Sequence, residues 1–75
     1  MAPSDPIELL NVVALIEDMP HEALVRGQVG TVVEVLAPDA FEVEFSDTSG
    51  QTYALVTLTS AKLMKLHHEP NHKAA

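Results

Sequence analysis

The stretch from residue 26 to residue 45, RGQVGTVVEVLAPDAFEVEF, alternates apolar and polar side chains more regularly than any other part of the chain. Successive side chains of a β-strand point to opposite faces, so a period of two indicates strands. β-Branched residues cluster at residues 31–33, which disfavours a helix. Between the two runs, Pro38 presets the backbone for a turn and Asp39 can hydrogen-bond its own turn backbone. This stretch therefore predicts a β-hairpin with its turn at residues 37–40.

The parity of this hairpin predicts which side chains are buried. On the first strand, the residues expected to face inward are Val29, Thr31, Val33 and Val35. The predicted buried cluster of the hairpin consists of Val33, Val35, Phe41, Val43 and Phe45. The opposite parity carries Glu34, Glu42 and Glu44 into water. A slip of one residue would invert every face, so burial of Phe45 is the test of this register.

Short strands and turns are predicted on both sides of the hairpin. Before the hairpin, we expect a strand at Asn11–Ile16 with Val13 and Leu15 inward, and a polar loop at Glu17–Arg26 with Met19 or Leu24 folded back onto the core. After the hairpin, we expect a turn at Ser46–Gly50 and a strand at Gln51–Leu58. A helical turn at Thr59–Lys62, capped by Thr59 or Ser60, and a last strand at Leu63–His67 complete the expected elements. The pattern of the fourth strand allows two inward faces. One consists of Tyr53, Leu55 and Thr57, and the other of Thr52, Ala54, Val56 and Leu58. A bulge would let Leu55 and Leu58 both face inward.

Three glycines mark turns or bulges in this plan. Gly27 and Gly30 frame the start of the hairpin, where a positive φ or a bulge is expected, and Gly50 is expected to be left-handed. A phosphate-binding loop would need a strand followed by a helix and more glycines, which the sequence lacks. The order of elements predicts an all-β domain, a small five-stranded SH3-like antiparallel barrel with one short helical turn before the last strand. Residues 7–67 form this domain, residues 1–6 a flexible N-terminal tail and residues 68–75 a polar C-terminal tail.

Charge limits the partners that such a domain can bind. The net charge is −7, ten of the eleven acids lie between Asp5 and Asp47, and three of the four basic residues lie in the last fourteen positions. This balance disfavours nucleic acid and anionic membrane surfaces and favours a basic partner protein. The chain has no cysteine, which is compatible with a reducing cytoplasm, and no basic leader precedes its first apolar run. We expect a cytoplasmic protein that is a monomer or a weak homo-oligomer.

Four blocks of the sequence resemble a known family. The blocks are VVALIEDMP, LVRGQVGTVVEV, FEVEFSDTSGQTYAL and LMKLH, and the resemblance covers about Leu10 to Pro70. They resemble a family of small bacterial proteins, the domain of unknown function four-nine-two-six. The resemblance implies a stand-alone SH3-like barrel and no activity that can be transferred. The G-x-V-G-T-V hairpin alone is similar to the nitrile hydratase beta subunit, to the SH3-like stromal subunit of photosystem I and to ribosomal barrels, the last of which are usually basic.

Residues with catalytic or metal-binding chemistry are sparse. His68 and His72 have a spacing that could ligate a metal on a helix, but Pro70 lies between them and no cysteine completes a common zinc site. The serines lie in predicted turns, and a barrel of this size is expected to lack room for a substrate pocket of roughly 300 Å³. We therefore expect no enzymatic activity, no metal site and no cofactor.

The leading hypothesis is a non-enzymatic protein-interaction module that docks a basic partner. Its candidate partner-binding residues are Glu34, Glu42, Glu44, Glu17, Asp18 and Tyr53. Tyr53 and the Glu17–Arg26 loop are the expected sides of any groove. Two alternatives stay open: an accessory or inhibitor protein of a nucleic-acid enzyme, with carboxylates imitating phosphates, and a metal-handling role through the tail histidines.

Overall fold

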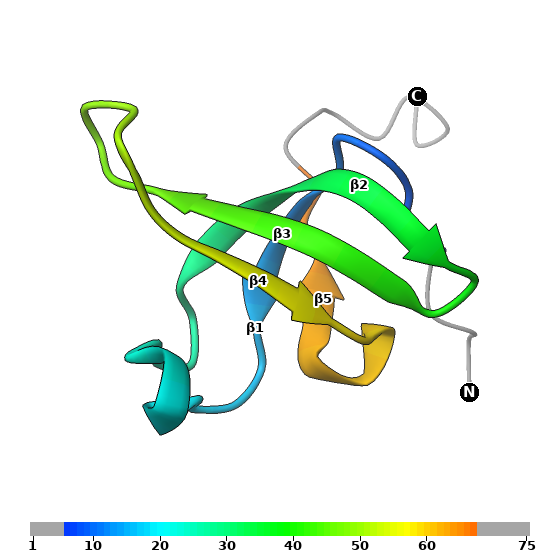
Figure 1. Ribbon diagram of the computed structural model, residues 1–75, viewed down its shortest axis with the longest axis horizontal. Helices are drawn as coiled ribbons and strands as arrows, with labels where there is room; N and C mark the ends of the chain where they lie inside the picture. Colours follow the sequence, from blue (N-terminus) through cyan, green and yellow to red (C-terminus); the bar gives the residue numbers. More distant parts are fainter. Residues whose placement is uncertain (1–5, 68–75) are drawn as a thin grey trace, which may run out of the picture.

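The computed structural model describes residues 6–67 and consists of five antiparallel strands in one sheet, in the order β4-β3-β2-β1-β5 (Figure 1). The elements are β1 (Val12–Leu15), the 3-10 turn η1 (Pro20–Glu22), β2 (Val29–Ala37), β3 (Ala40–Ser46), β4 (Thr52–Leu58), the 3-10 turn η2 (Ser60–Lys62) and β5 (Leu63–Lys65). The predicted all-β class, the five strands and the helical turn before the last strand are confirmed. Closure of the sheet into a barrel stays a prediction, because this order leaves β4 and β5 at its two edges. Residues 1–5 and the predicted C-terminal tail lie outside the described residues.

The predicted hairpin is the long β2–β3 pair, joined by a turn at Pro38 and Asp39. Its return strand has the predicted register: Phe41, Val43 and Phe45 are buried, and Phe45 is 0% exposed. This alternation is well specified because the opposite parity of β3 carries charged Glu42 and Glu44, which would be costly to bury. The sequence-based prediction for β3 is therefore confirmed.

The predicted inward face of β2 is wrong. Val32 is fully buried, whereas Val29 is 46%, Val33 38% and Val35 47% exposed. The register shifts between Val32 and Glu34, so Val33 is an extra residue in a β-bulge. Beyond the bulge the parity reverses, and Val35 pairs with Phe41 near the turn of the hairpin. Valines occupy both parities of this strand, so the apolar pattern by itself did not select a face.

Gly30 explains why the other parity faces the core. A Cβ atom on Gly30 would lie 2.7 Å from Val43 Cγ1 and 2.8 Å from the Glu44 carbonyl oxygen. Only a residue without a side chain permits this approach of β2 to β3, and Gly30 is itself buried. The expected left-handed conformation is found instead at Gly27 and Gly50, where φ is 93° and 86°.

The core lies between the β2–β4 layer and the two strands that cross behind it, β1 and β5 (Figure 1). Its residues are Val13, Leu15, Leu24, Val32, Phe41, Val43, Phe45, Val56, Leu58 and Leu63. The predicted inward pair Val13 and Leu15 is confirmed, and Leu24 does fold back from the loop, with Met19 packed partly against the core.

On β4, the inward set is Val56 and Leu58 with the partly buried Ala54. Of the alternatives that the sequence left open, those that place Leu55 inward are wrong, since Leu55 is 56% exposed. The β3–β4 pair does contain a register shift, which leaves Tyr53 as an extra residue between Thr52 and Ala54. The shift therefore lies ahead of Leu55 in the strand and does not turn Leu55 inward.

The β3–β4 turn is closed by Asp47. Its Oδ1 accepts hydrogen bonds from the Ser49 hydroxyl at 2.7 Å and from the backbone N–H groups of Ser49 and Gln51 at 2.9 and 3.0 Å. These bonds, that of the Ser49 hydroxyl most of all, hold the pKa of the Asp47 carboxyl below its ordinary value.

Residues 6–67 contain no helix with the length and apolar character needed to cross a membrane.

Candidate functional site

Three glutamates share the side of the β2–β4 layer that faces away from the core. Glu34 pairs directly with Glu42 across β2 and β3, and Glu42 pairs with Thr57 on β4. Glu44 lies between Thr31 on β2 and Leu55 on β4. We call this side the outer face, with its residues Thr31, Val33, Glu34, Glu42, Glu44, Thr52, Leu55 and Thr57. The structure thus brings together the three glutamates that the sequence proposed as partner-binding.

Two threonines of β4 fix the direction of two of these carboxylates. The Thr57 hydroxyl donates a hydrogen bond to Glu42 Oε1 at 2.7 Å, and the Thr52 hydroxyl donates one to Glu44 Oε2 at 2.9 Å. Both donors lie on the strand next to the glutamates, so the carboxylates extend over β4, toward the edge of the sheet. This arrangement was not predictable from the sequence, because the partners lie eight and fifteen residues apart.

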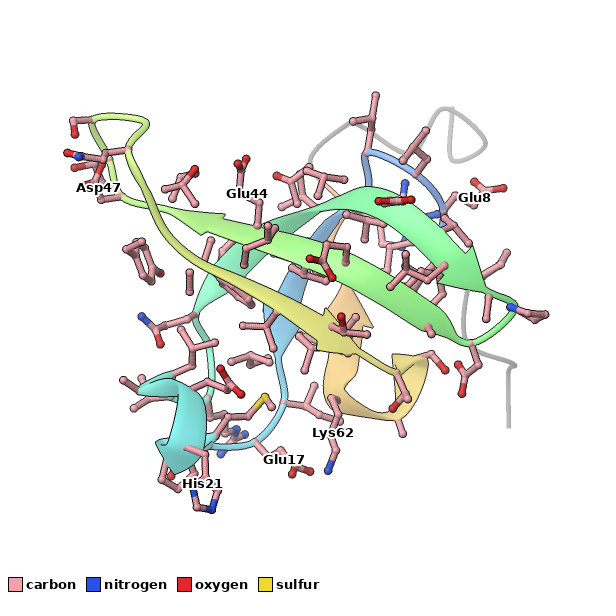
Figure 2. The ribbon with its side chains drawn as sticks, viewed as in Figure 1. Glu8, Glu17, His21, Glu44, Asp47 and Lys62 are labelled. Carbon is pink, nitrogen blue, oxygen red and sulfur yellow. The ribbon has the colours of Figure 1, made fainter. Side chains whose placement is uncertain are left out.

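No basic side chain neutralises the outer face within the described part of the chain. Among residues 6–67 the one ion pair joins Lys62 Nζ to Glu17 Oε2 at 2.8 Å. Figure 2 shows this pair at the lower side of the view, away from Glu44. Residues 6–67 contain nine carboxylates and three basic residues, so most of the acids keep their charge uncompensated.

We predict that salt stabilises this protein. Glu34 and Glu42 are opposed like charges on neighbouring strands, an arrangement that destabilises a sheet. Raising ionic strength from near zero to about 0.15 M shortens the screening length to about 8 Å and weakens that repulsion. The melting temperature, followed by circular dichroism at pH 7, should therefore rise over this range.

The matched variant is Glu34→Gln, which removes one partner of the pair and should show a smaller gain with salt. A melting temperature that falls as salt is added would contradict the prediction.

The other proposed partner-binding residues lie elsewhere. Glu17 forms the ion pair with Lys62, and Asp18 Oδ1 accepts the backbone N–H of Arg26 at 2.9 Å, so both have roles within the fold. Tyr53 packs against Phe45 with ring centroids 6.4 Å apart, and its hydroxyl accepts a hydrogen bond from Gln28 Nε2 at 3.2 Å. None of the three joins the glutamates of the outer face.

A groove of about 720 Å³ lies at the other edge of the sheet, between β5, η2 and the β2–β3 turn. Its lining residues are Pro6, Ile7, Ile16, Pro38, Asp39, Phe41, Ser60, Ala61, Leu63, Met64, Lys65 and His67. The expectation that the domain has no room for a cavity of this volume is wrong. Tyr53 does not line this groove, and a groove beside Tyr53 stays a prediction. Sequence analysis missed the groove beside β5 because its sides come from four segments that are distant along the chain.

The polar contacts inside the groove tether the fold. Asp39 Oδ1 accepts hydrogen bonds from the Ser60 hydroxyl and from the Ser60 backbone N–H, which ties the β2–β3 turn to η2. Because the Asp39 carboxylate contacts the Ser60 hydroxyl directly, no imidazole lies between the two groups to act as a general base. Lys65 Nζ donates to the Pro6 carbonyl oxygen at 3.4 Å.

The described residues contain no group of three or more histidine, cysteine or acidic side chains placed to hold a metal ion. The two histidines proposed as weak metal ligands, His68 and His72, lie outside the described part of the chain.

Comparison with known proteins gives one match. The model of the family described as Domain of unknown function (DUF4926) matches residues 9–65. No curated protein and no solved structure matches the chain. The predicted family resemblance is thus confirmed, whereas the weaker similarities of the hairpin stay predictions.

Proposed function

Since this chain belongs to the DUF4926 family, for which no function is described, we propose a function from its surface: a non-enzymatic protein-interaction module whose outer face docks a basic partner. The observation that carries the proposal is the set of Glu34, Glu42 and Glu44 on one face, without a basic side chain of residues 6–67 in ion-pair contact.

The energetics of this face support a binding role. Placing Glu34 opposite Glu42 costs stability, and a basic partner would relieve that repulsion on binding. The carboxylates also have defined directions through Thr52 and Thr57, so less ordering is needed when a cation approaches. A surface of one sign increases the rate of encounter with a surface of the opposite sign.

Exposed apolar side chains add area to the same face. Leu55 and Val33 lie on it and are 56% and 38% exposed. Interfaces commonly combine an apolar centre with charged groups around it. The outer face therefore offers both a hydrophobic contact and charge complementarity, which suits a protein surface better than a small ion.

Charge removal on the outer face tests this function. The native partner is first isolated by affinity capture on the unmutated protein, and its association rate is then measured by stopped flow at low salt. Glu34→Gln/Glu42→Gln/Glu44→Gln should lower that rate by about tenfold or more, because steering by the outer face is lost. The matched control, Glu8→Gln/Glu22→Gln, removes exposed acids elsewhere and should change the rate by less than about twofold.

Two results would overturn the proposal. One is an association rate that the triple variant leaves unchanged, after circular dichroism has shown that it is folded. The other is retention of duplex DNA or RNA by the unmutated protein at physiological salt, which would contradict the argument from charge.

A further inference from the structure

β4 is an edge strand whose one protective feature is the irregularity at Tyr53, near its start, so residues 54–58 are left unprotected. It is seven residues long, reads TYALVTL, and contains neither a charged residue nor a proline. Natural proteins usually shorten an edge strand, place charges on it or cover it, because its free backbone groups can pair with another strand. The opposite edge follows that rule: β5 has three residues, includes Lys65 and directly follows Lys62. Among the described residues, no strand pairs with the free side of β4.

The hydrogen-bonding parity of the sheet shows which backbone groups β4 leaves free. Val32 donates to the Asn11 carbonyl oxygen and accepts from Leu10 N–H, so its backbone groups point toward β1. Val43, opposite Val32, therefore directs its own backbone groups toward β4 and pairs there with Val56. It follows that Leu55 and Thr57, on either side of Val56, direct their N–H and C=O groups outward from the sheet.

These two residues also belong to the outer face. Leu55 pairs with Glu44 and Thr57 pairs with Glu42. Each of these two glutamates on β3 therefore has a neighbour on β4 whose backbone N–H and C=O groups are unpaired within residues 6–67. An added strand would place one side chain beside Leu55 and a second, two positions along, beside Thr57. Strands lie about 4.8 Å apart, so these side chains would start about 10 Å from the α-carbons of Glu44 and Glu42. A lysine or arginine is long enough to reach back over β4 to carboxylates that extend toward it.

We propose that β4 binds an extended basic segment of a partner protein as a sixth strand, antiparallel to β4 like every other pair of this sheet, with lysine or arginine at alternate positions. The inference rests on the proposed function and adds its binding mode. Backbone hydrogen bonds to Leu55 and Thr57 provide affinity, while Glu42 and Glu44 select basic side chains. The residue between two basic positions faces the core side beside Val56, so an apolar residue is preferred there.

Charge distinguishes this occupant from a second copy of the chain. Two copies paired through β4 would have their β3 strands about 14 Å apart, with Glu42 and Glu44 of both copies extending over the paired β4 strands toward each other, and each chain has a net charge of −7. Like charges that extend toward one another repel, which opposes this pairing. A basic segment removes that repulsion and is therefore the partner that the edge favours.

The test is fluorescence anisotropy with a labelled peptide, TKVKVKT, and the full chain. Its isomer TKKVVKT has the same charge but no two lysines two positions apart, and should bind about tenfold more weakly. Backbone N-methylation of the lysines should weaken binding about tenfold or more, because those N–H groups face β4 in the proposed pairing. The matched control is N-methylation of the valines, whose N–H groups face away from β4, with an expected change below about twofold.

Variants of the protein test the same contacts from the other side. Leu55→Pro removes one outward N–H without breaking a bond to β3 and should weaken binding about tenfold, whereas Leu55→Thr keeps the N–H and should have little effect. Glu42→Gln/Glu44→Gln should weaken binding about tenfold, and the control Glu8→Gln/Glu22→Gln by less than about twofold. If Leu55→Pro does not fold, the N-methylated peptides test the backbone contacts on the unmutated protein.

The outcomes separate this inference from the function on which it rests. Equal binding of the two N-methylated peptides would overturn strand addition, and the proposed function would stand if Glu42→Gln/Glu44→Gln still weakened binding. An unchanged affinity in that glutamine variant would count against both. Dimers of the unmutated protein in sedimentation analysis, lost in Leu55→Pro, would identify a second copy as the occupant and overturn the proposal.

Discussion

Phe45→Ala is expected to lower the free energy of unfolding by about 3–5 kcal/mol, the usual cost of truncating a buried aromatic side chain. Phe45 is fully buried, and its neighbours across the strands are Gly30 on β2 and Ala54 on β4. Since both neighbours are small, Phe45 supplies most of the volume of this row, and neither neighbour is large enough to fill the cavity. A domain of this length has a total stability of roughly 4–11 kcal/mol, so the substitution should remove at least about a quarter of it.

Urea denaturation followed by circular dichroism measures this loss. The control is Val33→Ala at the β-bulge, where the side chain is 38% exposed and lies outside the core cluster, with an expected change of about 1 kcal/mol or less. A small effect of Phe45→Ala together with a large effect of Val33→Ala would mean that the hairpin has the opposite register.

Gly30→Ala has the second-largest expected effect, a loss of about 1–3 kcal/mol or more from overpacking. The new methyl group would lie 2.7 Å from Val43 Cγ1 and 2.8 Å from the Glu44 carbonyl oxygen. The valine side chain can move, but the carbonyl belongs to the backbone of β3, so the two strands must separate locally. The expected result is a lower urea midpoint with an unchanged denaturant slope, which indicates altered stability rather than altered compactness.

A double variant identifies the cause of that loss. Val43→Ala removes the clashing Cγ1 atom, so the cost of Gly30→Ala should be smaller in the Val43→Ala background than in the unmutated protein. The carbonyl of Glu44 stays in place, and the rescue should accordingly be partial. Additive costs of the two substitutions would show that contact with Val43 does not limit the residue at position 30.

The shared basis of these two predictions is the row that Phe45 forms with Gly30 and Ala54. One large residue lies between two small ones, so a smaller residue at position 45 or a larger one at position 30 should lower the free energy of unfolding. The outer side of the same strand carries Glu44, whose charge and direction the proposed function uses. Stability and binding can thus be varied independently, by substitutions on opposite faces of β3.

Strand β3 shows what the sequence by itself determined about this protein. Its apolar residues occupy one parity and its glutamates the other, and burial of Glu42 and Glu44 would cost far more than their exposure. Only one register satisfies that pattern, so burial of Phe45 and the acidic outer face were predictable. The turn at Pro38 and Asp39 and the left-handed glycine at residue 50 were predictable for the same kind of reason, since each depends on local backbone chemistry.

Strand β2 and the edges of the sheet were decided only by the tertiary structure. Valines on both parities of β2 give two faces of similar hydrophobicity, and the choice came from the close approach of Gly30 to β3 and the bulge at Val33. The free side of β4 and the groove beside β5 depend on the strand order and on segments far apart in the chain, such as Ile16, Pro38 and Met64. A periodic pattern records how each residue faces its own strand neighbours, and it contains no information on which strands are adjacent or which edge stays unpaired.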